Sequence, residues 1–129
     1  MMSFNSVMAD NRTPIVVSQS QKDALLAEMR ELLKTSQEVL EGVVNKDMEM
    51  VEKSARLMGI NATKTIPPGV GKLLPSGFKS MGPQVHKGFE RIANEADGFG
   101  DTDKILKILS DTQKVCTACH SVYQFTVKK

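Results

Sequence analysis

The pentapeptide Cys116-Thr117-Ala118-Cys119-His120 constrains this chain more than any other stretch. It matches C-x-x-C-H, the pattern of covalent c-type haem attachment. The chain has only two cysteines and two histidines, so this short segment holds both thiols and one of the imidazoles. The chemistry requires such spacing, because each thiol adds to a haem vinyl group and the following imidazole binds the iron. The motif predicts one haem c, attached through Cys116 and Cys119, with His120 as proximal iron ligand.

Three other uses of this motif are weaker. A thioredoxin-like redox pair also has C-x-x-C, but it belongs to a βαβ context that the sequence does not predict. A closed zinc site needs a third and a fourth ligand, and only His86 or a carboxylate could complete it. A disulfide between cysteines three residues apart would strain a helix.

Composition favours a helical protein of one domain. The chain has 129 residues, with eight methionines, no tryptophan and one tyrosine. Its apolar residues are mainly Leu, Val, Ile, Ala and Met, which suit helices more than sheets. The net charge is only +2, and no dense basic cluster indicates nucleic-acid binding. No apolar run approaches the length of a membrane span.

The chain divides into an N-terminal arm, residues 1–17, and a bundle domain, residues 18–129. Pro14 and the polar residues before it break regular structure in the arm. We interpret Ile15-Val16-Val17 as an extended lead-in, and packing on the bundle is the alternative. A first helix is predicted from Ser18 or Ser20 to about Asn45, with its apolar residues at helical spacing. These are Leu25, Leu26, Met29, Leu32, Leu33, Val39, Leu40, Val43 and Val44.

Three more helices follow. The second runs from Met48, after the possible cap Asp47, to about Met58. Two adjacent prolines and nearby glycines make 60–77 a loop. A third helix starts between Pro75 and Lys79 and ends near Asp97. The last is capped by Asp101 or Thr102, carries the haem motif near its end, and extends toward a tail with two terminal lysines. Four such helices predict an all-α, antiparallel up-down-up-down bundle.

The position of Cys116-x-x-Cys119-His120 in the last of four helices, followed by Tyr123, resembles the cytochrome c′ family and its low-spin, methionine-ligated relatives. The resemblance spans about residues 20–126. Pro75-x-x-Phe78 and the glycine–aspartate turn before the last helix match more loosely. The resemblance implies a four-helix bundle with haem c on its last helix, and it places Tyr123 among the cofactor-binding residues.

The resemblance also directs attention to Met29. In that family a residue of the first helix lies over the distal face of the haem, and Met29 matches it. As a sixth iron ligand Met29 would make the protein an electron carrier. If Met29 only fills the core, as methionines usually do, the iron is five-coordinate and binds nitric oxide or carbon monoxide. Met58 and Met81 are the next candidates, and we interpret both as packing residues. Met8, Met48 and Met50 are less suitable still.

Two positions depart from the family pattern. Gln124 stands where a basic residue usually follows the haem histidine, which puts the family's usual pH-dependent spin behaviour in doubt. Many members of the family have Arg-Gln just before the distal residue, and this arginine pairs with a haem propionate. Here Ala27-Glu28 precedes Met29, so that arginine is absent. Arg30 or a lysine could replace that arginine, but a solvated surface charge is the better interpretation. The second histidine, His86, could bind the iron, but a half-exposed helix surface is the better interpretation, because its helical neighbours Lys87 and Glu90 are polar.

The remaining expectations concern partners and location. No acid–base pair converges in the sequence, so we do not expect an enzyme. Redox partner proteins are expected, and Lys114, Lys128 and Lys129 could steer an acidic partner, although solvated lysines are the simpler interpretation. The resemblance implies export to the bacterial periplasm and allows a homodimer through the first two helices. Residues 1–14 do not resemble a signal peptide, so we interpret the chain as one whose signal is absent.

Overall fold

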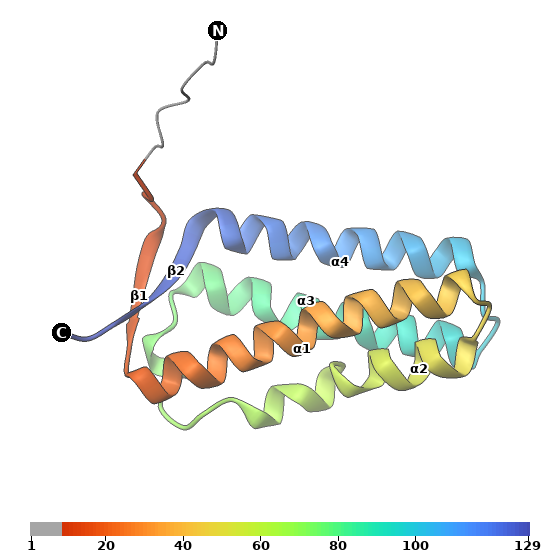
Figure 1. Cartoon of the computed structure of the whole chain (residues 1–129), viewed down its shortest axis with the longest axis horizontal. Helices are drawn as coiled ribbons and strands as arrows, with labels where there is room; N and C mark the ends of the chain where they lie inside the picture. The colour runs from red at the N-terminus through yellow and green to blue at the C-terminus, as the bar shows by residue number, and fades with distance from the viewer. Residues whose placement is uncertain (1–8) are drawn as a thin grey trace, which may run out of the picture.

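The computed structural model describes residues 9–129, without the side chains of Lys64 and Thr65. It is mostly helical with four α-helices, which confirms the predicted fold class at that level. Helix α3 packs against both α2 and α4, and α1 packs against α2. Figure 1 shows the helices side by side along the long axis, with the α1–α2 and α3–α4 turns at the end opposite the strands. The elements are β1 Thr13–Val17, α1 Gln19–Val44, α2 Met48–Leu57, α3 Ser76–Asp97, α4 Thr102–Val122 and β2 Tyr123–Val127.

The helix starts follow the predicted caps. Ser18 caps α1 in a capping box, in which its Oγ accepts from Gln21 N at 3.2 Å and Gln21 Oε1 accepts from Ser18 N at 2.9 Å. Asp47 Oδ1 accepts from Met50 N at 3.0 Å at the start of α2. Asp101 Oδ1 accepts from Lys104 N at 3.2 Å at the start of α4. These bonds satisfy amide groups that have no partner inside a helix.

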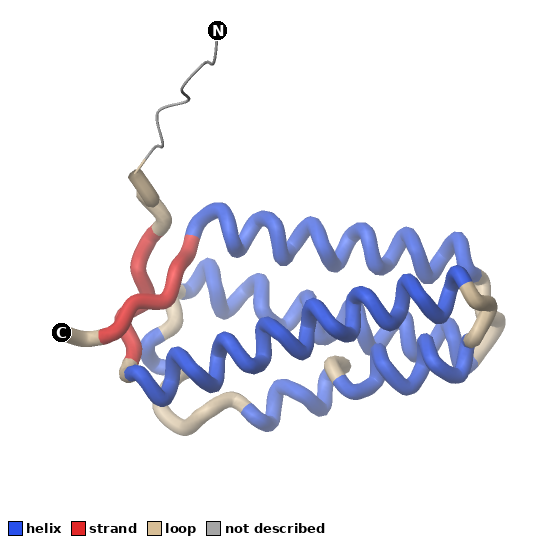
Figure 2. The backbone as a smooth tube through the Cα atoms, viewed as in Figure 1, coloured by secondary structure: helices blue, strands red, loops and turns tan. Residues whose placement is uncertain are grey.

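The ends of the described chain differ from the prediction. The tail does not extend the last helix, because Tyr123–Val127 forms strand β2. It pairs in parallel with β1, Thr13 opposite Tyr123 and Val17 opposite Val127 (Figure 2). Aromatic and β-branched residues in both segments suit a strand. Residues 13–17 are therefore a paired strand rather than a free lead-in, and residues 1–8 of the predicted arm lie outside the described residues.

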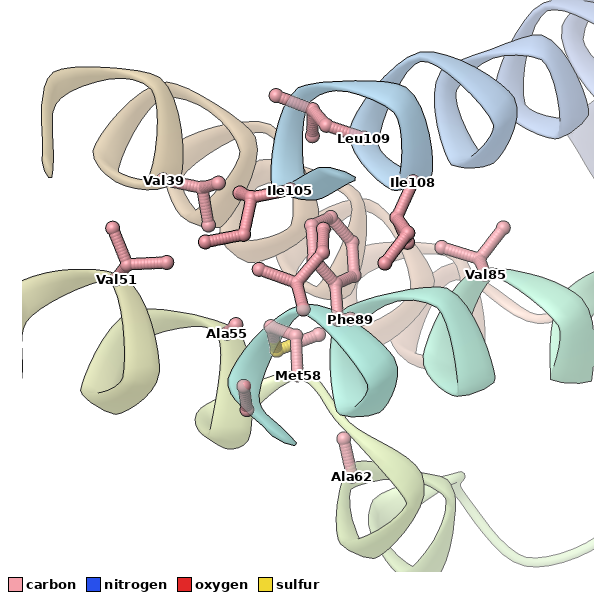
Figure 3. Packing of buried hydrophobic residues seen from close by; sticks show 12 residues of the cluster. Val39, Val51, Ala55, Met58, Ala62, Val85, Phe89, Ile105, Ile108 and Leu109 are labelled. Carbon is pink, nitrogen blue, oxygen red and sulfur yellow. The ribbon is translucent and has the colours of Figure 1, made fainter. Parts of the chain in front are cut away.

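Two clusters of buried side chains form the core. The smaller one joins the sheet to the helices: Ile15 and Val17 of β1 are buried with Leu25 of α1 and Val70 of the α2–α3 connection. Packing of the Ile15–Val17 run on the bundle is thus the arrangement observed. The larger cluster lies among the four helices, where its side chains converge around Phe89 (Figure 3).

The predicted apolar stripe of α1 divides into two faces. Leu25 and Val39 are buried, but several of its other members lie on the surface: Leu26, Leu33, Leu40 and Val44. The connection predicted at 60–77 ends earlier, because α3 begins at Ser76, and it holds two short 3-10 helices, Ile60–Thr65 and Gly71–Leu73. Among the described residues, none of the helices is both long enough and apolar enough to cross a membrane.

Candidate functional site

One cavity brings together the residues that the sequence singles out. It has a volume of about 270 Å³ and lies between α1, α3, α4 and the 60–74 connection. The last turns of α4 place Cys116, Cys119 and His120 on its wall, and α1 places Met29 there. Most of the remaining lining is apolar: Leu25, Leu32, Ile66, Leu74, Phe78, Met81, Val85 and Val115.

A second cavity of about 240 Å³ adjoins the first at the strand end of the bundle. Met29, Phe78, Cys119 and His120 line both cavities, so these side chains form a common wall. The ring of Phe78 meets Tyr123 edge-on, with centroids 5.9 Å apart. Tyr123 itself lines the second cavity. Sheet and helices therefore both contribute to the surroundings of His120.

Both thiols are free and half-buried. Burial raises the pKa of Cys116, and burial followed by repulsion from Cys116 raises the pKa of Cys119. A reactive C-x-x-C pair has a lowered thiol pKa and lies at a helix N-terminus. Here the pair lies near the C-terminal end of α4, where the helix dipole disfavours a thiolate. This environment argues against a thioredoxin-like pair.

In the part of the chain that the structure describes, no three or more His, Cys, Asp or Glu side chains are grouped to hold a metal ion. A haem iron takes only its axial ligands from the protein and does not need such a group.

His86 is the main departure from the predicted site. The sequence places it on a half-exposed surface, but its side chain is buried and lines the larger cavity. Its Nδ1 is 2.8 Å from the backbone oxygen of Met58, and its Nε2 is 3.3 Å from Glu28 Oε1. The signal was present in the sequence, because His86 shares a helical face with the buried residues Phe89 and Ala93. The polar neighbours Lys87 and Glu90 obscured it.

These contacts favour the protonated form of His86. A backbone carbonyl only accepts hydrogen bonds, so the Nδ1 next to Met58 carries a proton. A carboxylate also only accepts, so the contact of Nε2 with Glu28 is strongest when Nε2 carries a proton as well. The hydrogen bond to Glu28 is the main cause that raises the pKa of His86. Burial opposes this shift.

Arg12 is a second residue that sequence reasoning missed. It lines the smaller cavity from the chain just before β1. Its Nη1 donates to the backbone oxygens of His120 and Tyr123, both at 3.3 Å. Hydrogen bonds that Arg12 donates to Asp10 lower the pKa of that carboxyl group to about 2. Gln124, the position that departs from the family pattern, donates its amide to the Arg12 backbone oxygen at 2.9 Å. A guanidinium from a distant segment thus lies near His120 although residue 124 is neutral.

The arrangement suits the chemistry of a haem c. Two thiols, the imidazoles of His86 and His120 and the thioethers of Met29 and Met81 line one mainly apolar cavity, and such groups are the ones that this cofactor uses. Met81 also lines the larger cavity, whereas Met58 belongs to the core cluster. Met48 and Met50 line neither of these two cavities, and Met8 lies outside the described residues.

Comparisons with protein-family models, with curated proteins and with solved structures gave no match to this chain.

Proposed function

We propose that this protein is a mono-haem c-type cytochrome that carries electrons, built as an antiparallel up-down-up-down bundle similar to cytochrome c′. One observation carries the proposal. Met29 of α1 and His120 of α4 line the same cavity, and both thiols of the C-x-x-C-H motif line it too. A thioether and an imidazole from different helices are thereby available to one iron.

Each residue has a distinct part in this proposal. Cys116 and Cys119 would attach the cofactor through thioether bonds, and His120 and Met29 would bind the iron. When bound, haem c supplies an iron centre that cycles between the ferric and ferrous states. Met29 as a ligand would favour the ferrous state and keep small molecules from the iron. The apolar lining would limit the access of water, and electrons would pass to partner proteins without a bound substrate, so the proposal is for an electron carrier and not for an enzyme.

The test of Met29 is optical spectroscopy of the purified ferric and ferrous protein, with and without carbon monoxide. We expect a low-spin spectrum with a far-red methionine-to-iron band, which Met29→Ala abolishes. Met81→Ala is the matched control, because Met81 lines the same cavity, and it should keep the band. A high-spin ferrous protein that binds carbon monoxide at once would sink the Met29 assignment. It would favour the alternative, a five-coordinate protein that binds nitric oxide or carbon monoxide.

Covalent attachment is tested separately. After acid–acetone extraction the haem should stay with the wild-type chain, and Cys116→Ala combined with Cys119→Ala should release it. Haem that is extracted from the wild-type protein, or never incorporated during expression with a haem c maturation system, would overturn the whole proposal. Because such maturation takes place outside the bacterial inner membrane, the proposal includes a periplasmic location.

The proposal includes a homodimer as the pairing that the family resemblance implies. The exposed side chains Leu33 and Leu40 lie seven residues apart along α1. Leu57 of α2 is also exposed. A seven-residue apolar repeat on a helix surface is typical of contact with another helix.

A further inference from the structure

Charge is unevenly distributed along the long axis of the bundle. Dividing α1, α3 and α4 at their midpoints separates residues 9–31, 60–86 and 112–129, at the cavity and strand end, from residues 32–59 and 87–111 (Figure 1). The cavity end has nine Lys and Arg against four Asp and Glu, a net charge of +5. The opposite end has eight against eleven, a net charge of −3. The small total charge of +2 therefore conceals a strong dipole.

Three lysines near the cavity mouth have no ion-pair partner within the described part of the chain. Lys22 lines the smaller cavity and Lys79 lines the larger one. Lys72 follows Gly71, which lines the larger cavity. No ion pair or side-chain hydrogen bond engages these three ammonium groups among the described residues. They are available to a partner without loss of an internal contact.

The opposite end has an excess of acidic residues, and some of its cations are paired with them. Arg56 pairs with Glu90 at 2.7 Å, and Lys104 pairs with Glu95 at 3.0 Å. Lys53 and Lys87 of that end have no ion pair among the described residues, so the two ends differ in net charge rather than in pairing. The net charge directs an anionic partner to the cavity end.

Apolar side chains lie among the unpaired lysines. Leu26 and Ile66 line the cavities and are 37% and 41% exposed. Leu73, next to Lys72, is 42% exposed. A small apolar centre with charged surroundings is the usual composition of a transient protein interface. Such an interface allows fast association and fast release.

We propose that the cavity mouth, defined by Lys22, Lys72, Lys79, Leu26, Ile66 and Leu73, docks the acidic surface of a redox partner protein. This inference rests on the proposed electron-carrier function and names the partner's chemistry. Anionic membranes are recognised by clusters of about four to eight neighbouring cations. The mouth instead spaces its lysines singly on α1, α3 and the connection between them.

Binding is tested on the purified holoprotein with a hexaglutamate peptide as the acidic probe, followed by NMR chemical shifts. We expect shifts at the mouth residues that weaken as salt is raised. Lys22→Glu combined with Lys79→Glu should weaken binding ~10-fold or more. The matched control is Lys53→Glu combined with Lys87→Glu, which makes the same change in net charge at the opposite end and should weaken binding far less. An equal loss of peptide affinity in both variants, or chemical-shift changes at residues outside the mouth, would contradict the proposal.

Vesicles of phosphatidylglycerol and phosphatidylcholine test the competing possibility that the mouth binds a membrane surface. If the holoprotein binds these vesicles through the same lysines but does not bind the peptide, the partner is a membrane surface and the proposal is wrong. If the peptide binds at the mouth and the vesicles do not, the protein-partner proposal stands.

Electron exchange gives an independent measurement. The reduced holoprotein gives one electron either to ferricyanide, forming ferrocyanide, or to the cationic oxidant tris(phenanthroline)cobalt(III), forming the cobalt(II) complex. Lys22→Glu combined with Lys79→Glu should slow the first reaction and speed the second, whereas the control pair should leave their ratio nearly unchanged. If the ratio of the two electron-transfer rates is unchanged in the mouth variant while the methionine-to-iron band is normal, only the docking proposal is wrong. If that band is absent from the wild-type protein, the Met29 assignment is wrong, and the peptide-binding result still stands by itself.

Discussion

The imidazole Nε2 of His86 lies 3.3 Å from the carboxylate Oε1 of Glu28, and this contact links α3 to α1 across the bundle. The other ring nitrogen reaches the carbonyl of Met58 at the end of α2, 2.8 Å away. Three segments are thus joined at one buried imidazole in the cavity wall. Glu28 directly precedes Met29, so the same network constrains the backbone that carries the proposed iron ligand.

Removing one partner of this network should destabilise the fold. We expect Glu28→Ala to lower the free energy of unfolding by ~1–3 kcal/mol, because it leaves the buried Nε2 of His86 without its hydrogen-bond partner. The nearby exposed Glu31→Ala should change it by less than ~0.5 kcal/mol. A double-mutant cycle with His86→Ala, measured by urea unfolding, should give a coupling of ~0.5–3 kcal/mol. Additivity of the two single effects would show that the contact contributes nothing.

The same contact predicts a pH dependence. The pKa of His86 is raised in the folded protein, chiefly by the hydrogen bond to Glu28. The resulting stabilisation is fully present below the unfolded histidine pKa of about 6.5, and it is lost as the pH rises through the folded pKa. Wild-type protein should therefore lose stability over that window, and His86→Gln should lose less. Urea midpoints measured at a series of pH values give both curves, and parallel curves would refute this assignment.

The fold was predictable where the information is local. The caps Ser18, Asp47 and Asp101 and the C-x-x-C-H spacing each depend on residues within a few positions of one another. The pairing of β1 with β2 depends on segments more than a hundred residues apart, and a five-residue apolar run could equally end a helix or form a strand. His86 was missed because polar neighbours in sequence are not its neighbours in space. The Arg12 contact with His120 is non-local for the same reason.

Strand β1 offers a test of the non-local pairing. Ile15 is 2% exposed and Val16, the next residue, is 45% exposed. Ile15→Ala should cost ~2–5 kcal/mol in unfolding free energy, because it leaves a cavity against Leu25 and Val70. Val16→Ala should cost far less, since it removes a largely solvated side chain. Similar small effects at both positions would mean that β1 does not pack on the bundle in solution.

The exposed leucines of α1 test the homodimer. Leu33 is 73% exposed and Leu40 is 49% exposed, and they are seven residues apart on one face. If this face joins two copies, Leu33→Glu combined with Leu40→Glu should convert a dimer to a monomer, because burying carboxylates against a second apolar face is costly. Leu106→Glu on α4, which is 37% exposed, is the control and should leave the dimer intact. Sedimentation equilibrium over a range of concentrations measures the mass. A wild-type protein that is monomeric throughout would show that this apolar face has no second copy as its partner.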